Sequence, residues 1–200
     1  MNKDEYKTIK NISQSKLLVK KSRFFGLASN IELPEDAGSF LEYAKGKYPK
    51  ASHYCYAYTT GHSEKKIEYS SDAGEPTNSA GPPILSAIQA SGLDNIICVV
   101  VRYFGGIKLG IGGLIRAYGK CARDCLQEAE VITKVFYQNL LIKTPHQFIG
   151  DVINLGRSHH GEVVDVGYDK KAEIQLKIRE REINNFLNAL KGIGSDITVD

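Results

Sequence analysis

The sequence contains no apolar segment long enough to cross a lipid bilayer. Its longest unbroken apolar run is Ile96–Val101, whereas a membrane-spanning helix needs about 20 apolar residues in succession. The first residues mix acidic and basic side chains with no apolar stretch behind them, which predicts no secretion signal. We therefore expect a protein of the cytoplasm that has no membrane partner.

Paired cysteines and the common catalytic signatures are also missing. The four cysteines include no Cys-x-x-Cys pair, which favours reduced structural thiols over disulfides. His53, Cys55 and His62 match no known zinc-binding spacing, so we predict no metal site. Neither Gly-x-Ser-x-Gly nor His-Glu-x-x-His occurs. The sequence thus predicts no catalytic residue and no cofactor, and it favours a binding protein over an enzyme.

Charge of one sign is in only slight excess. The net charge is +3, and residues 1–130 carry 17 Lys and Arg against 14 Asp and Glu, while residues 131–200 carry 9 of each sign. A dedicated nucleic-acid-binding domain is usually much more basic. Nucleic-acid binding would therefore require a fold that gathers a few cations at one place, and we expect no readout of DNA sequence.

The pattern of apolar residues predicts two domains, over residues 1–130 and 134–200. The elements predicted in the first include helix 34–47, strands 53–60 and 67–70, helix 84–91, strand 96–101 and a helix that ends near 130. Those predicted in the second are strand 134–143, helix 146–157, strands 162–167 and 171–179, helix 181–191 and strand 196–199. The βαββαβ order of the second domain is typical of ferredoxin-like folds.

The most informative segment lies between the apolar strand 96–101 and the helix that follows it. It contains the glycines Gly105, Gly106, Gly110, Gly112 and Gly113. Such glycines allow backbone N–H groups to turn toward an anion at the positive end of the helix dipole. The alternative is that they only allow the helix to pack closely on the strand.

Several cations accompany these glycines. Arg102 precedes the loop, Lys108 lies within it and Arg116 follows one helical turn later, so the three charges could converge on a phosphate. We include Arg23 in the same predicted phosphate or nucleic-acid site. No Walker A loop is present, because Ile111 follows Gly110 where that motif needs lysine.

Asp72 and Glu75 form a second candidate site, in a loop crowded with turn-forming residues. Two carboxylates three residues apart could act as acid and base or hold a metal ion. The simpler interpretation is that Asp72 caps a turn while Glu75 is exposed to solvent.

Four segments resemble the motifs of the IMPACT/YigZ family. They are Lys21–Gly26, Ser52–Tyr58, Ser71–Leu85 and Val101–Gly110. The resemblance implies an α+β protein in which a ribosomal protein S5 domain 2-like domain precedes a ferredoxin-like domain. Eukaryotic relatives regulate translation, whereas the bacterial relatives have no settled biochemical role. The chain departs from the family pattern at Ala73, where a second acidic residue is frequent, and at Asn78, where glycine is frequent.

Three functions are compatible with this sequence. The first is a translation-associated regulator that binds RNA, the ribosome or a translation factor through the basic glycine-rich segment. The second is a kinase-like or hydrolytic enzyme acting on a small phosphate compound, because sugar-type kinases share the S5-like fold, although a shared fold is weak evidence for chemistry. The third is a module that binds only another protein.

Overall fold

The computed structural model describes residues 4–61, 66–194 and 196–199, and it contains two compact units. The first unit is residues 7–133, and the second is residues 134–200 together with the described residues before Lys7. His62 lies outside the described residues. Among the described residues, no helix combines the length and the apolar character that a membrane span requires.

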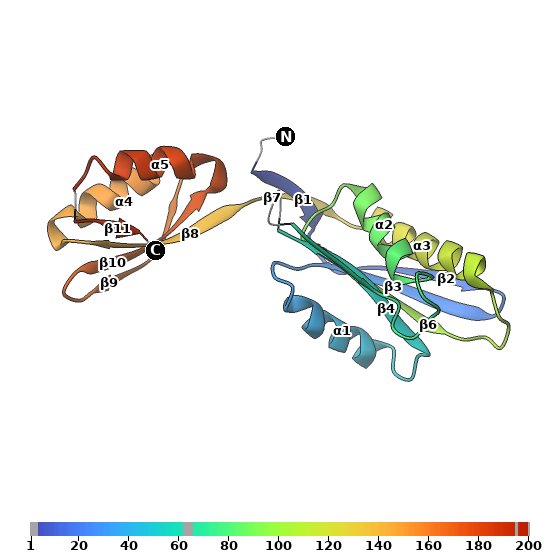
Figure 1. The fold of residues 1–200 in the computed structure, drawn as a ribbon. Helices are drawn as coiled ribbons and strands as arrows, with labels where there is room; N and C mark the ends of the chain where they lie inside the picture. The colour runs from blue at the N-terminus through green and yellow to red at the C-terminus, as the bar shows by residue number, and fades with distance from the viewer. Residues whose placement is uncertain (1–3, 62–65, 195, 200) are drawn as a thin grey trace. The chain divides into compact units, whose positions relative to one another are not determined.

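A five-stranded antiparallel sheet forms the centre of the first unit (Figure 1). In spatial order its strands are β2 (Ser13–Val19), β3 (Ser22–Asn30), β6 (Ile96–Tyr103), β4 (His53–Thr60) and β5 (Ile67–Ser71). The apolar run occupies β6, the middle strand, whose residues are buried from Ile96 to Arg102. The predicted strand 96–101 is therefore confirmed, and it is buried on both faces.

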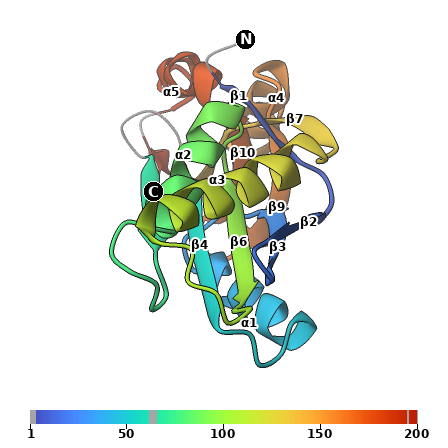
Figure 2. The same cartoon turned by 90° about the vertical axis from the view of Figure 1, so that its right-hand side faces the viewer.

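Helices cover both faces of this sheet. α2 (Gly81–Ser91) and α3 (Ile111–Gln127) lie over one face, as Figure 2 shows, and α1 (Asp36–Lys47) lies on the other. The side chains of β6 alternate between the two cores, because successive residues of a strand point to opposite faces. Val100 packs in the α2/α3 core, and Val101 packs in the α1 core.

Two boundaries in this unit differ from the sequence prediction. α2 begins three residues before the predicted 84–91, because Pro82 and Pro83 occupy its first turn, where a missing N–H group costs no hydrogen bond. α3 ends at Gln127 rather than near residue 130.

The predicted strand 134–143 is in fact two strands. β7 (Val131–Val135) and β8 (Tyr137–Thr144) are separated at Phe136. β7 pairs in a two-stranded sheet with β1 (Glu5–Ile9), a strand that the sequence did not indicate.

The second unit contains a four-stranded antiparallel sheet. Its order is β11 (Thr198–Val199), β8, β10 (Ala172–Arg179) and β9 (Glu162–Tyr168). Helices α4 (Ile149–Ser158) and α5 (Ile183–Leu190) lie on the same face, each preceded by a short 3-10 turn (Figure 1). Buried and exposed side chains alternate strictly along most of β10.

The residues just before Lys7 pack on the second unit, whereas the sequence prediction placed all of residues 1–130 in the first. Asp4 accepts a hydrogen bond of 2.9 Å from Arg179 Nε, and its side chain is only 2% exposed. Tyr6 stacks on Phe136 with the ring centroids 4.1 Å apart. These contacts join residues that are far apart in sequence, which explains why local patterns did not reveal them.

Candidate binding site around the glycine-rich loop

The glycine-rich loop connects β6 to α3 in the first unit. A Cβ atom on Gly105 would overlap the backbone of Lys21, in the turn between β2 and β3. Gly106 and Gly110 have φ angles of +81° and +72°, which residues with a side chain rarely adopt. Three of the loop glycines therefore have a steric role.

Gly112 and Gly113 are different, because they form part of the first turn of α3. The first backbone bond of the helix is donated by Leu114 N–H to the carbonyl of Gly110, at 2.9 Å. The N–H groups of Ile111, Gly112 and Gly113 precede that bond, and no side chain caps them. The positive end of the α3 dipole is therefore open to a ligand.

The start of α2 is already occupied by a carboxylate. Asp72 Oδ1 accepts hydrogen bonds from the N–H groups of Ala80 (2.8 Å) and Gly81 (2.9 Å), and Oδ2 accepts one from Asn78 (2.8 Å). The turn-capping interpretation of Asp72 is confirmed. The backbone at Ala73 and Asn78 has positive φ, a conformation that favours glycine.

The capping role of Asp72 predicts a pH-dependent stability. Burial alone would raise the pKa of Asp72, but N–H donors from Gly81, Ala80 and Asn78 hold it below the ordinary value of 3.8. A lowered pKa in the folded state means that the stabilisation is present above pH 4 and is lost as the pH falls through the lowered pKa. We expect Asp72→Ala to cost about 1–2 kcal/mol in urea unfolding at pH 7 and much less at pH 3.

Asp151 provides the matched control, because it is exposed in the first turn of α4. Asp151→Ala should change the free energy of unfolding little at either pH. A cost of Asp72→Ala that stays constant down to pH 3 would contradict the capping role of the ionised carboxylate.

Glu75 is buried, so the expectation that it is exposed was wrong. Its side chain is 4% exposed, and Oε1 accepts hydrogen bonds from Arg102 Nη1 (2.5 Å) and the Tyr118 hydroxyl (2.7 Å). Arg102 is 6% exposed in its side chain, and Nη2 donates to Ser22 Oγ at 3.3 Å. The positive charge of Arg102 is thus compensated by Glu75 rather than free to bind phosphate.

The neighbouring thiol and phenol keep their protons. Burial raises the pKa of Cys55 to about 12 and the pKa of Tyr118 well above its ordinary value. Cys55 Sγ donates to the carbonyl of Asp72 at 2.9 Å. A nucleophilic cysteine requires a thiolate, so this arrangement favours Cys55 as a structural residue.

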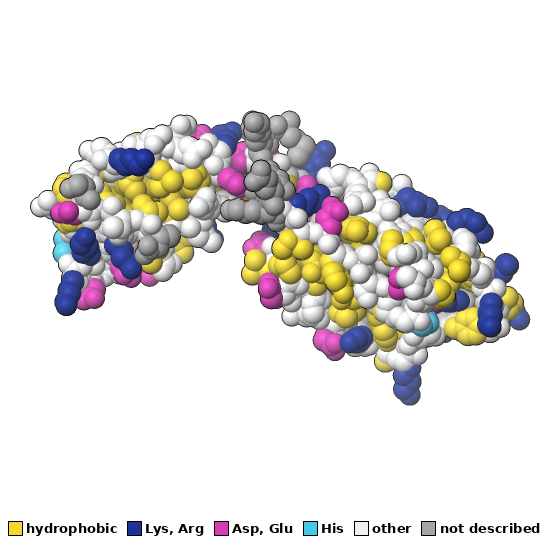
Figure 3. Space-filling view, in the orientation of Figure 1, with side chains coloured by type: hydrophobic (Ala, Val, Ile, Leu, Met, Phe, Trp, Pro, Cys, Tyr) yellow, Lys and Arg dark blue, Asp and Glu magenta, His cyan; other side chains and the backbone are white. Residues whose placement is uncertain are grey.

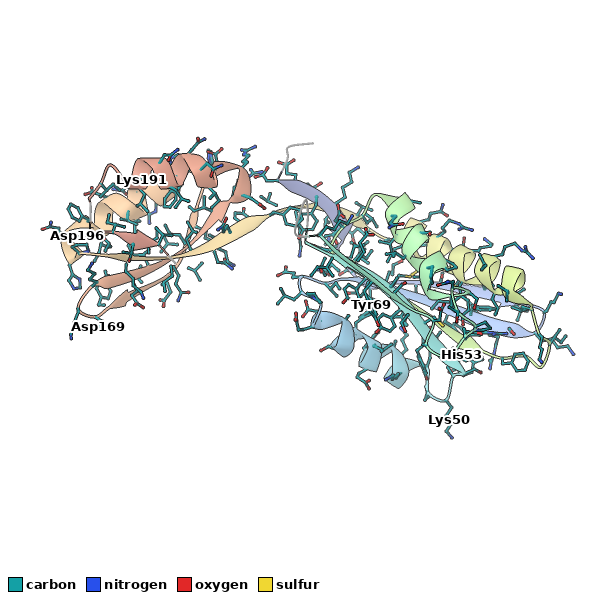
Figure 4. The ribbon with its side chains drawn as sticks, in the orientation of Figure 1. Lys50, His53, Tyr69, Asp169, Lys191 and Asp196 are labelled. Atoms are coloured by element: carbon teal, nitrogen blue, oxygen red, sulfur yellow. The ribbon has the colours of Figure 1, made fainter. Side chains whose placement is uncertain are left out.

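A cavity of about 530 Å³ lies between the glycine-rich loop and the Asp72–Glu75 loop. We call it the loop cavity. Its polar lining consists of Ser52, His53, Glu75, Arg102 and Lys108. Its apolar lining consists of Pro76, Phe104, Leu109, Ile111 and Leu114, with Gly110 completing the wall. Figure 4 labels His53, which is the first residue of β4 and lines the cavity.

Arg116 lines a separate cavity of about 200 Å³, on the other side of Leu109. Lys20 and Lys120 line the same small cavity. The sequence prediction missed both lysines. Lys120 could have been found, because it follows Arg116 by one helical turn, but Lys20 is brought here by the close approach of Gly105 to the β2–β3 turn.

Arg23 does not join the other predicted cations. It projects from the opposite face of the sheet from Phe24, and its guanidinium lies over the ring of Tyr103, 5.0 Å from the ring centroid. The structure thus separates the predicted set into Lys108 and Arg102 at the loop cavity, Arg116 at the small cavity, and Arg23 across the sheet. Figure 3 shows Lys and Arg side chains along the edge formed by α3 and the β2–β3 turn.

These features define a mixed α/β protein of two units, the first of which carries cations and a partly apolar cavity around a glycine-rich loop. Residues 20–126 match the family model of the Impact N-terminal domain. The chain therefore belongs to the IMPACT family, as the motif resemblance predicted.

Its relatives match over most of their length. The chain is 32% identical over 181 residues to the IMPACT family member YvyE of Bacillus subtilis (strain 168), covering 90% of this chain and 83% of that protein. It is 31% identical over 170 residues to the family member YigZ of Escherichia coli (strain K12), covering 84% and 83%. A crystal structure described as that of a hypothetical protein is 26% identical, with a TM-score of 0.75 over 98% of this chain and 96% of the other.

Proposed function

We propose that this protein is a translation-associated regulator of the cytoplasm that binds RNA or the ribosome through the glycine-rich end of its first unit. The observation that carries the proposal is the placement of Lys108 and Arg116 on the two sides of Leu109, with Lys20 beside Arg116. Among the described residues, these three cations have no ion-pair partner. They are therefore available to bind phosphate groups.

The start of α3 adds to this positive surface. The uncapped N–H groups of Ile111–Gly113 lie between the loop cavity and the small cavity, which are lined by Gly110 and Gly113 respectively. Lys, Arg and free helix N-terminal amides are the groups that contact nucleic-acid phosphates. The one carboxylate of the loop cavity, Glu75, is neutralised by Arg102, so it does not offset these charges.

The competing functions receive less support from the geometry. Asp72 is held by three backbone N–H groups, and Cys55 is protonated, so neither is arranged as an acid, a base or a nucleophile. A translation factor remains the alternative partner to RNA, and a nuclease-resistant complex would identify it.

The proposal includes the folds and extents of the two domains. For residues 134–200, the strand order β11-β8-β10-β9 and the two helices on one face support a ferredoxin-like domain. For the first unit, family membership supports an S5 domain 2-like domain.

We expect binding to ribosomes and ribosomal RNA to weaken steeply as salt increases. The double variant Lys108→Ala/Arg116→Ala should bind more weakly at low salt, and it should reduce the slope of log K against log salt by about 1.4, the effect of losing two contacts to single-stranded phosphates. Filter binding and ribosome co-sedimentation at four or more salt concentrations would measure both quantities.

Lys45→Ala/Lys47→Ala is the matched control, because it removes the same charge from the end of α1, on the opposite face of the sheet. This variant should bind like the wild type. Equal affinity and equal slope in the wild type and the Lys108→Ala/Arg116→Ala variant would refute the proposal.

A further inference from the structure

Glu75 and His53 both line the loop cavity, and each offers a hydrogen-bond acceptor. Glu75 Oε1 is occupied by Arg102 and Tyr118, whereas Oε2 has no hydrogen-bond partner within the described part of the chain. This Oε2 lies 4.0 Å from His53 Nε2. His53 Nδ1 lies 3.0 Å from the carbonyl oxygen of Ala73. A carbonyl can only accept, so Nδ1 carries a proton, and when the ring is neutral Nε2 is the second acceptor.

Glu75 Oε2 is accessible from the cavity, where it can accept a hydrogen bond from a bound ligand. An amino group has two hydrogens and can serve both acceptors. Arg102 and Glu75 neutralise each other, so Lys108 and the start of α3 give the cavity a positive excess, which disfavours a cationic ammonium group. The best-matched ligand therefore carries a neutral, aromatic amino group.

The apolar wall of the cavity suits an aromatic ring. Phe104 lines the cavity and is 48% exposed, so its ring is accessible to a ligand. The Arg102 guanidinium lies over its ring, 5.3 Å from the ring centroid, and so helps to fix the ring in place. A planar ligand can stack on Phe104 and contact Leu109 and Leu114 behind it. The volume of about 530 Å³ is enough for a nucleobase with its sugar.

We infer that the loop cavity binds an unpaired nucleobase with an exocyclic amino group, namely adenine, cytosine or guanine, from a single RNA strand. The base stacks on Phe104 and donates its amino hydrogens to Glu75 Oε2 and His53 Nε2. The flanking phosphates lie along Lys108 and the first amides of α3. Uracil has no amino group, and its single N3–H, flanked by two carbonyl oxygens, can serve at most one of the two acceptors. This inference rests on the proposed function and adds to it a base preference.

The test compares hexamers of adenosine, cytidine and uridine, bound to the full chain and followed by fluorescence anisotropy. The wild type should bind the adenosine and cytidine hexamers roughly tenfold more tightly than the uridine hexamer. Phe104→Ala should weaken binding of the adenosine hexamer roughly tenfold, with the salt slope unchanged, because stacking carries no charge. Phe104→Tyr should retain the affinity.

Ile115→Ala is the control, since Ile115 is an exposed apolar residue of α3 (41% exposed) that does not line the cavity. It should bind all hexamers like the wild type. Two results would contradict the inference and leave the proposed function intact. One is salt-dependent binding with equal affinity for the adenosine and uridine hexamers, and the other is an unchanged affinity of Phe104→Ala for the adenosine hexamer. Failure of the proposed function would appear separately, as hexamer binding that is unaffected by Lys108→Ala/Arg116→Ala.

A protein partner would give a different result in the same assay. If a short peptide with a free amino terminus displaces the adenosine hexamer and its acetylated form does not, the cavity binds a chain terminus and the inference is overturned. Absence of hexamer binding at any salt concentration would overturn both the inference and the role of RNA.

Discussion

Replacing Glu75 by alanine is expected to lower the free energy of unfolding by about 3–5 kcal/mol, the usual cost of removing one partner of a buried ion pair. Within the described part of the chain, the substitution leaves Ser22 as the one hydrogen-bond partner of the Arg102 guanidinium, on a side chain that is 6% exposed. Arg102 Nε already lacks a partner in the described part of the chain, so the substitution adds to an existing deficit of hydrogen bonds on this guanidinium. Urea unfolding at pH 7, followed by circular dichroism, measures the loss.

Two further variants separate the ion pair from general packing. Glu75→Gln keeps an oxygen for Arg102 and Tyr118 and should cost clearly less. Glu75→Leu/Arg102→Met removes both charges and should recover most of the stability, because apolar residues of similar size often replace a buried pair without loss. If Glu75→Ala costs less than about 1 kcal/mol, Arg102 can turn to solvent and regains the phosphate-binding role that the sequence suggested.

Much of the fold could be predicted because its signals are local. In β6 every residue of the run is apolar, which indicates a strand buried on both faces. In β10 every second residue is apolar, which indicates a strand buried on one face. The break at Phe136 could not be predicted in this way. It depends on the pairing of β7 with β1, more than a hundred residues earlier in the sequence.

The candidate site shows the same division between local and distant causes. Asp72 caps residues six to nine positions later, and the turn-forming residues between them reveal that role. Glu75 is bonded to Arg102 and Tyr118, which lie 27 and 43 residues away in the sequence. The residues adjacent to Glu75 in the sequence do not indicate these contacts. To predict whether the cations converge, one must know on which side of the sheet each side chain lies. Arg23 lies on the wrong side for the site.

Gly105→Ala is expected to destabilise the first unit by about 3 kcal/mol, because the added Cβ would overlap the backbone of Lys21, which cannot move like the end of a flexible side chain. Gly112→Ala is the matched control. Its Cβ would meet only Arg116 Nη1, at 3.5 Å, and alanine is favoured over glycine within a helix, so it should be neutral or stabilising by up to about 1 kcal/mol.

The pair of variants also distinguishes the two roles proposed for the loop glycines. Gly105 joins the β2–β3 turn, which carries Lys20, to the loop that carries Lys108. Gly105→Ala should therefore reduce both stability and RNA affinity. Gly112→Ala should reduce affinity alone if phosphate approaches the α3 backbone closely. Equal stability of the two variants would show that the turn and the loop are not held together at Gly105, and the cations at the two cavities would then lose the link that positions them.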